Sequence, residues 1–330
     1  MTSKSPRPKT TGLRPDAPTV SSPATQEGLE KQGFRLALGR TVWHLIGTEG
    51  TEDWLVQFAR ILELERWSPS AVNGGQVRKL IFWNSLKPVA ISTREYLSQA
   101  ASPRFDRGGW MSHWINPTRI WTHPDSPDVL LEIRLFEHDM LAVENMAKSC
   151  FALFQPLISE GGLVLHAALV ERNGQGLALV ASGGVGKSTC ARRLPAPWKA
   201  LCDDTCLILP DGRGGYRAHP FATWSDYLWR RSRGTWKVEN HVPLRAVFFL
   251  KPSEADNVQL LGQGESSIYL CRSSLELLGD SLRSIDQDRA RSLRQEIFAN
   301  ACAVRRAVPG YWLEANLNGQ FWTEIEKALG

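Results

Sequence analysis

The sequence predicts a mixed α/β protein in which a strand–loop–helix core follows a smaller, tryptophan-rich α+β region. Two observations lead to this fold class. A glycine-rich loop at residues 181–189 stands between a predicted strand and a predicted helix, and strand-like apolar runs alternate with amphipathic helical stretches. We therefore expect three parts: a disordered lead-in at 1–31, a small α+β domain at 32–128 and the core domain at 129–330.

In the first part of the chain, the spacing of apolar residues predicts a small sheet with helices. The pattern favours strands at 35–38, 41–46, 77–83 and 129–135, helices at 54–64 and 138–157, and a loop with short turns at 102–128. Seven of the thirteen tryptophans lie between Trp43 and Trp121. Because aromatic side chains bury large areas, these residues predict a compact core, with an aromatic surface that grips a peptide as the alternative.

The second part is predicted to open with a β-hairpin. Residues 163–170 form an apolar strand, Asn173-Gly174 is a typical hairpin turn, and a return strand at 176–181 leads directly into the glycine-rich loop. The pattern then predicts helices at 187–194, 286–307 and from 320 onward, and strands at 205–209, 244–250 and 311–317.

The composition excludes several classes of protein. Hydrophobic content of 42% and charge of 22% are ordinary for a globular chain, and no apolar run approaches the roughly eighteen residues of a membrane helix. The start lacks a signal core, so we expect a cytoplasmic protein without a membrane partner. The net charge of +5 is scattered apart from residues 229–233, so nucleic acid is not expected either. The six cysteines are predicted to be buried thiols, with a redox or metal role for Cys202 and Cys206 as the alternative.

The glycine-rich loop carries the residues that a triphosphate site needs. Its glycines let backbone N–H groups turn toward phosphate oxygens. Lys187 is expected to reach the terminal phosphates and Ser188 to ligate Mg²⁺, so ATP and Mg²⁺ are the expected cofactors. The predicted nucleotide contacts are Ser182, Gly183, Gly184, Val185, Gly186, Lys187, Ser188 and Thr189.

Acid–base chemistry is predicted beside this loop. Asp203 and Asp204 follow a short strand, and adjacent side chains there point in different directions. One carboxylate can hold the metal while the other faces a substrate hydroxyl. His166 lies in the strand that pairs with the strand feeding the loop, so it is either a hydrogen-bonded core residue or a neighbour of the phosphates and acids.

His166, residues 182–188 and Asp203-Asp204 together resemble the C-terminal kinase domain of HPr kinase/phosphorylase, whose fold is similar to the P-loop domain of phosphoenolpyruvate carboxykinase. The resemblance covers residues 162–209. It implies a serine-directed kinase in which Lys187 contacts phosphate, Asp203 is the general base, Asp204 is the metal partner and His166 is their catalytic neighbour. The chain departs from that pattern at Ala181 and at Thr189, where those enzymes usually carry an acidic residue. It also lacks their phosphorylase signature, so phosphorolysis is not expected.

A second resemblance covers more of the chain. Residues 161–167, 186–190 and 219–225, with the tryptophan-rich N-terminal part, are similar to the SynChlorMet cassette protein ScmC group. Those proteins accompany radical SAM maturases and a PqqD-like peptide carrier. The resemblance implies a ribosomally made peptide precursor or small protein as substrate and these cassette proteins as partners. Because related kinases assemble as rings, a homo-oligomer is a further expectation. The alternatives are a non-catalytic, nucleotide-gated accessory protein for peptide maturation and a small-molecule kinase.

Overall fold

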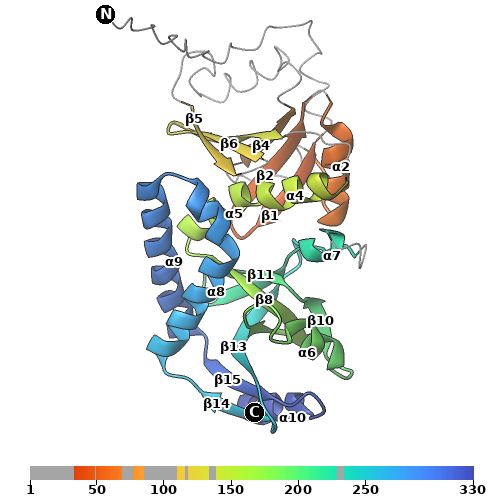
Figure 1. The fold of residues 1–330 in the computed structure, drawn as a ribbon, viewed down its shortest axis with the longest axis vertical. Coiled ribbons are helices and arrows are strands. Elements are labelled where there is room, and N and C mark those ends of the chain that lie inside the picture. The colour runs from red at the N-terminus through yellow and green to blue at the C-terminus, as the bar shows by residue number, and fades with distance from the viewer. Residues whose placement is uncertain are drawn as a thin grey trace, which may run out of the picture.

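The computed structural model describes residues 33–48, 50–68, 77–84, 110–115, 118–133, 139–228 and 234–330. These residues form a mixed α/β fold with two mixed sheets, one at either end of the long axis in Figure 1. The lead-in predicted at 1–31 and the basic cluster at 229–233 lie outside the described residues. Among the helices that are described, none is long and apolar enough to cross a membrane.

The first sheet has seven strands in the order β3-β1-β2-β4-β7-β6-β5. Strand β2 runs parallel to β4 and β4 parallel to β7, whereas the other neighbours are antiparallel. The strands are β1 (Phe34–Leu38), β2 (Thr41–Gly47), β3 (Glu65–Arg66), β4 (Val77–Asn84), β5 (Met111–Ile115), β6 (Thr118–His123) and β7 (Ser126–Ile133). The predicted strand pair around Gly39 is confirmed, and so is the strand at 77–83.

The tryptophans of this region serve mainly as core. Trp43, Trp54 and Trp83 are buried, and the remaining four of the seven are half-buried. Helix α2 (Glu52–Ile61) places Trp54 and Phe58 against Phe82 of the sheet, with ring centroids 4.9 and 5.8 Å from that ring. This packing agrees with the compact-core interpretation of the aromatic residues.

Two predictions for this part of the chain are wrong. The expected loop at 102–128 contains strands β5 and β6 and the start of β7, because Met111 to Ile115 pairs with Thr118 to Thr122 in a ladder that apolar alternation alone does not reveal. The single helix expected at 138–157 consists of α4 (Asp139–Ser149) and α5 (Phe151–Ser159), which meet at Cys150. Pro156 lies inside α5 rather than ending the helix, and the N–H of Glu160 still donates to the Pro156 carbonyl at 2.9 Å.

The second sheet has eight strands that partly close on themselves. Strand β8 pairs with β9, β10 and β11, while β13 pairs with β9, β12 and β15, so β8, β11, β12, β13 and β9 form a closed ring. Its strands are β8 (Leu163–Arg172), β9 (Gln175–Val180), β10 (Lys199–Cys202), β11 (Thr205–Pro210), β12 (Tyr216–Pro220), β13 (Val242–Pro252), β14 (Asn257–Leu260) and β15 (Gly310–Ala315). The predicted hairpin is confirmed.

Helices flank this second sheet. The pair α8 (Gln263–Ser284) and α9 (Gln287–Ala307) lies along one side, as Figure 1 shows in blue. The shorter α6 (Lys187–Arg193), α7 (Trp224–Leu228) and α10 (Phe321–Leu329) pack elsewhere around it. The helices predicted at 187–194 and 286–307 and from 320 onward are confirmed to within one residue.

The two sheets share one hydrophobic core, and specific polar contacts join them. Glu239 accepts hydrogen bonds from the Arg35 guanidinium at 3.0 and 3.1 Å and from the backbone N–H of Ala37 at 2.5 Å. The rings of Phe58 and Trp224 stack with centroids 6.0 Å apart. Residues far apart in sequence thus fix one sheet against the other.

Candidate functional site

The glycine-rich loop leaves strand β9 at Val180 and enters helix α6 at Lys187. Gly184 has φ of 79° and Gly186 has φ of 114°. A side chain would strain the backbone at both positions, although there is open space around each of them. The loop therefore has the left-handed backbone that the glycine spacing predicts.

Lys187 turns back over the loop that precedes it. Its ammonium group donates to the carbonyl of Ala181 at 2.7 Å and to that of Ser182 at 3.2 Å, and the residue is only 6% exposed. Burial lowers the pKa of this ammonium. The carboxylates of Asp204, Glu276 and Asp203 oppose that shift, so the lysine lies within electrostatic reach of three acids.

The register of β8 and β11 brings His166 to the acids. His166 is opposite Thr205 in this antiparallel pair, and the N–H of Ala167 donates to the carbonyl of Asp204 at 2.9 Å. As a result, His166 Nε2 lies 3.2 Å from the Asp204 carboxylate. The Asp203 carboxylate has a different partner, because it accepts a hydrogen bond from the Thr223 hydroxyl at 2.8 Å.

Glu276 of α8 belongs to the same cluster, although the sequence analysis did not identify it. Its carboxylate accepts hydrogen bonds from the Ser182 hydroxyl at 2.9 Å and from the N–H of Gly183 at 3.4 Å, and it lies 3.5 Å from His166 Nδ1. Partial burial opposes ionisation, but the bonds from Ser182 and Gly183 and the nearby imidazole together lower the pKa of Glu276. His166 is therefore placed between two carboxylates, one of which covers the loop.

The other predicted loop residues take simpler positions. Val185 is half-buried against a second group of buried apolar side chains, which includes residues of α6, and Thr189 is exposed. Ser188 begins the first turn of α6 beside Lys187, and within the described residues no hydrogen bond joins it to Asp204. The structure therefore brings together Lys187, His166 and the aspartate pair, whereas it leaves Ser188 and Thr189 without a direct contact to the acids.

Ser188 and Asp204 carry oxygen donors, which are the kind of ligand that Mg²⁺ takes. No group of three or more His, Cys, Asp or Glu side chains suited to a metal occurs in the part of the chain that the structure describes. Mg²⁺ in nucleotide sites takes only one or two protein oxygens and completes its shell with phosphates and water. The thiols of Cys202 and Cys206 are buried, and burial raises the pKa of Cys202 to about 12 and that of Cys206 well above its ordinary value, so both are protonated.

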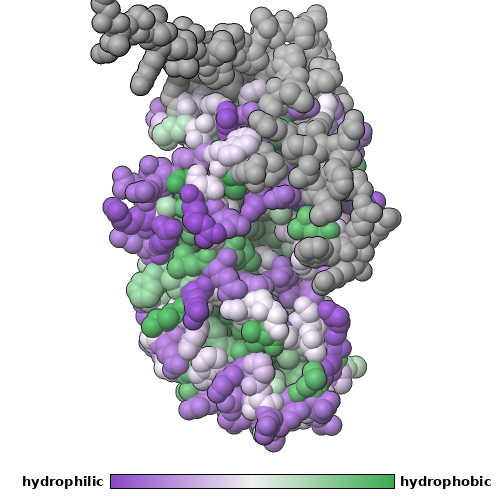
Figure 2. Space-filling view, viewed as in Figure 1, coloured by the Kyte–Doolittle hydropathy of each residue, from purple (hydrophilic) through white to green (hydrophobic). Residues whose placement is uncertain are grey.

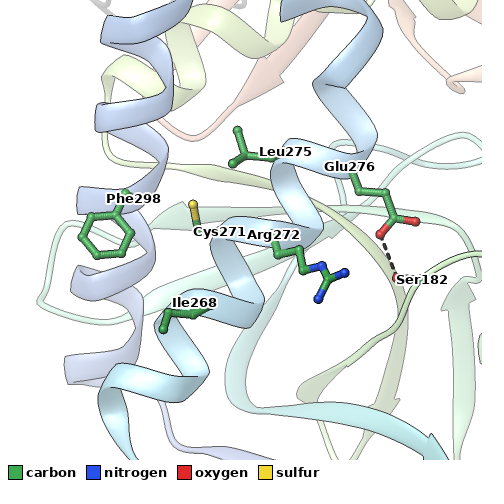
Figure 3. A pocket seen from close by; sticks show the side chains of 7 residues that line it. All are labelled: Ser182, Ile268, Cys271, Arg272, Leu275, Glu276 and Phe298. Carbon is green, nitrogen blue, oxygen red and sulfur yellow. Dashed lines mark hydrogen bonds between the residues drawn. The ribbon is translucent and has the colours of Figure 1, made fainter.

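A groove of about 570 Å³ opens beside the loop. Figure 3 shows its lining along α8, with Phe298 of α9 on one side of that helix and Ser182 and Glu276 on the other. Ile268 is 60% and Phe298 50% exposed there, and Figure 2 shows apolar surface over this part of the two helices. The volume lies within the range of small-molecule sites, about 300–1,000 Å³.

Fold and site thus define a mixed α/β protein in which a glycine-rich strand-to-helix loop faces a histidine and three carboxylates. The model of the family described as SynChlorMet cassette protein ScmC matches residues 129–330. That match covers more than half of the chain, which therefore belongs to this family. No curated protein matches the chain.

Proposed function

We propose that the protein is an ATP- and Mg²⁺-dependent phosphotransferase of the HPr-kinase-like kind, acting on a serine or threonine hydroxyl of a peptide or small protein. The observation that carries the proposal is the convergence of Lys187, His166 and the Asp203-Asp204 pair at one end of the glycine-rich loop. Membership of a cassette-protein family supports a peptide precursor as the acceptor and other cassette proteins as partners.

Each residue has a defined role in this proposal. The backbone of residues 182–189 holds the phosphates, and Lys187 leaves the carbonyls of its own loop to contact the terminal ones. Ser188 and Asp204 would hold Mg²⁺, which neutralises phosphate charge when bound. The groove beside Ser182 would take the base, because its apolar wall and Arg272 suit a flat aromatic ring.

The transfer itself needs one proton acceptor. Asp203 takes the proton of the acceptor hydroxyl as the hydroxyl oxygen bonds to the terminal phosphorus, and the bond from that phosphorus to the bridging oxygen breaks to release the nucleoside diphosphate. Thr223 orients Asp203 through their hydrogen bond of 2.8 Å. His166 orients Asp204 through its contact of 3.2 Å.

Two substitutions separate binding from transfer. Lys187→Ala should abolish ATP·Mg²⁺ binding in titration calorimetry, with Lys199→Ala as control, an exposed lysine paired with Glu171 at the hairpin end of β8. Asp203→Asn should retain binding and lose phosphopeptide formation, with the exposed Asp288→Asn of α9 as control. Unchanged affinity in the lysine variant would reject the phosphate site, and full turnover in the aspartate variant would reject the base.

One observation favours a second candidate, a nucleotide-gated accessory protein without catalysis. The Glu276 carboxylate already occupies two donors of the loop, so an incoming phosphate has to displace it from them. Such a displacement would report nucleotide binding to a partner. ATP binding without any phosphopeptide in mass spectrometry would favour this candidate over the kinase.

A further inference from the structure

A second, smaller cavity opens beside the aspartate pair. Its volume is about 190 Å³, and Asp204 lines it. The walls come from five segments, namely α4, α5, the start of β11, the stretch after β12 and α8, and their aromatic and aliphatic members include Phe151, Phe154, Phe221, Trp224 and Leu277. The lining is mostly aromatic and aliphatic, and its polar members are Lys148, Asp204, Thr205 and Ser281.

The segment that shapes this cavity also orients the proposed base. Thr223, which donates to the Asp203 carboxylate at 2.8 Å, lies between Phe221 and Trp224 in the chain. Phe221 is fully buried and contacts Phe154 edge to face at 5.2 Å. Trp224 stacks on Phe58 of the first part of the chain. The aromatic wall and the acid are thus held by the same rigid stretch.

The size and polarity of the cavity indicate its occupant. A volume of 190 Å³ is below the range of about 300–1,000 Å³ for whole small-molecule sites and is suited to a single side chain. Seven of the eleven lining side chains are aromatic or aliphatic, and Lys148 and Thr205 already pair with Asp280 and Asp204, so the favourable occupant is apolar. At the rim, Lys148 lies 3.5 Å from Asp280, and this ion pair leaves the entrance without a strong net charge.

We propose that this cavity binds an apolar side chain of the acceptor peptide, one or two residues from the hydroxyl that is phosphorylated. The inference rests on the proposed function, because only a hydroxyl presented to Asp203 places its neighbours beside the cavity. A residue spans about 3.3–3.6 Å of extended chain, so a neighbour within two residues reaches the opening that Asp204 lines. The acceptor is then a peptide segment in which Leu, Met or Phe flanks Ser or Thr.

The test uses the full-length protein and degenerate nonapeptides with a fixed central Ser or Thr, scanned at the two positions on each side. We expect phosphorylation about ten- to a hundredfold faster for Leu, Met or Phe than for Ala or Asp at one of these positions. Leu277→Trp should fill the cavity and reduce that preference to about twofold or less, and Leu277→Ala should shift it toward Phe. Leu317→Trp, an exposed leucine after β15, is the matched control, and ATP affinity checks that each variant folds.

A second readout does not depend on transfer. Peptides that carry a photo-reactive leucine are crosslinked to protein loaded with a non-hydrolysable ATP analogue. The photo-reactive leucine stands at the preferred position, or at each scanned position in turn if no position is preferred. Crosslinks at residues 147–154, 221–224 or 277–281 without any phosphopeptide would leave the cavity assignment standing and reject the kinase. The cavity assignment would be overturned if phosphorylation showed no side-chain preference, or if the preference survived in both Leu277 variants. Crosslinks only at residues outside these three ranges would overturn it as well. Transfer to small hydroxy compounds with no peptide crosslinked would overturn it too.

Discussion

Glu276→Gln should strengthen nucleotide binding. In the structure the Glu276 carboxylate holds the hydroxyl of Ser182 and the N–H of Gly183, and both donors belong to the loop that is proposed to cradle phosphates. A phosphate group at the loop meets a fixed negative charge there and has to displace it. Glutamine keeps the length and shape of the side chain and removes the charge, so the variant isolates the electrostatic effect.

The magnitude follows from Coulomb's law. A nucleotide–Mg²⁺ complex with about two net negative charges, centred about 6 Å from the carboxylate, is repelled by about 1.4 kcal/mol at a dielectric constant of about 80. Because the Glu276 side chain is 38% exposed, the water-like value is the appropriate one. A free energy of about 1.4 kcal/mol is a factor of about ten in affinity, which salt near 0.15 M reduces to about three to ten.

The assay is titration of a fluorescent ATP analogue with Mg²⁺ at low salt and at about 0.5 M salt. The affinity gain should shrink at high salt, because screening weakens the repulsion that the substitution removes. Glu265→Gln, at the start of the same helix and about 16 Å away along its axis, is the matched control and should change nothing. Equal or weaker binding by Glu276→Gln would refute the reasoning and indicate that the carboxylate helps to hold the nucleotide or its metal.

Three further predictions concern stability. Glu239→Ala should lower the free energy of unfolding in urea by about 1–3 kcal/mol, because it leaves the Arg35 guanidinium and the Ala37 N–H without their acceptor; no change would show that the joint between the sheets is dispensable. Burial, together with the charge of Lys79, lowers the pKa of His44 to about 3. Below about pH 6.5, His44 is therefore protonated in the unfolded chain and stays neutral in the folded chain. The free energy of unfolding should therefore fall by up to about 1.4 kcal/mol per pH unit toward pH 3, with a shallower slope in His44→Gln; equal slopes would contradict this. Asn300→Ala should cost about 1–3 kcal/mol in the same urea assay, because its amide donates to two carbonyls at the end of α5, at 2.7 and 2.9 Å; an unaltered midpoint would argue against that role.

Local signals in the sequence were sufficient to predict the hairpin of β8 and β9 and the glycine-rich loop that follows it. Asn173 and Gly174 adopt φ of 52° and 75°, the angles that this pair favours in a two-residue turn, so β8 and β9 were predictable to within two residues. The loop between β9 and α6 followed from its glycines for the same reason. The sequence left open whether His166 lies in the core or beside the acids, and the pairing of β8 with the strand that begins at Thr205 places it 3.2 Å from Asp204.

Helix α8 shows why the remainder was not predictable. Its buried face consists largely of serines, among them Ser266, Ser267, Ser273, Ser274 and Ser281, so the apolar periodicity that identifies an amphipathic helix is weak. Without that helix there was no basis for bringing Glu276 to the loop. The leucines at 270, 277, 278 and 282 are the signal that could have located it. The cavity beside Asp204 was not predictable either, since its walls come from five segments, most of them distant in sequence.

The boundary of the family match falls inside a strand of the first sheet. Residue 129 lies within β7, which pairs on one side with β4 and on the other with β6. A fragment that starts at residue 129 would lose both neighbours of this strand and the Phe58 ring that supports Trp224. It would expose the apolar run at 129–133 as an unpaired strand edge, which is a template for aggregation. We therefore expect a fragment cut at residue 129 to aggregate more readily than the full chain.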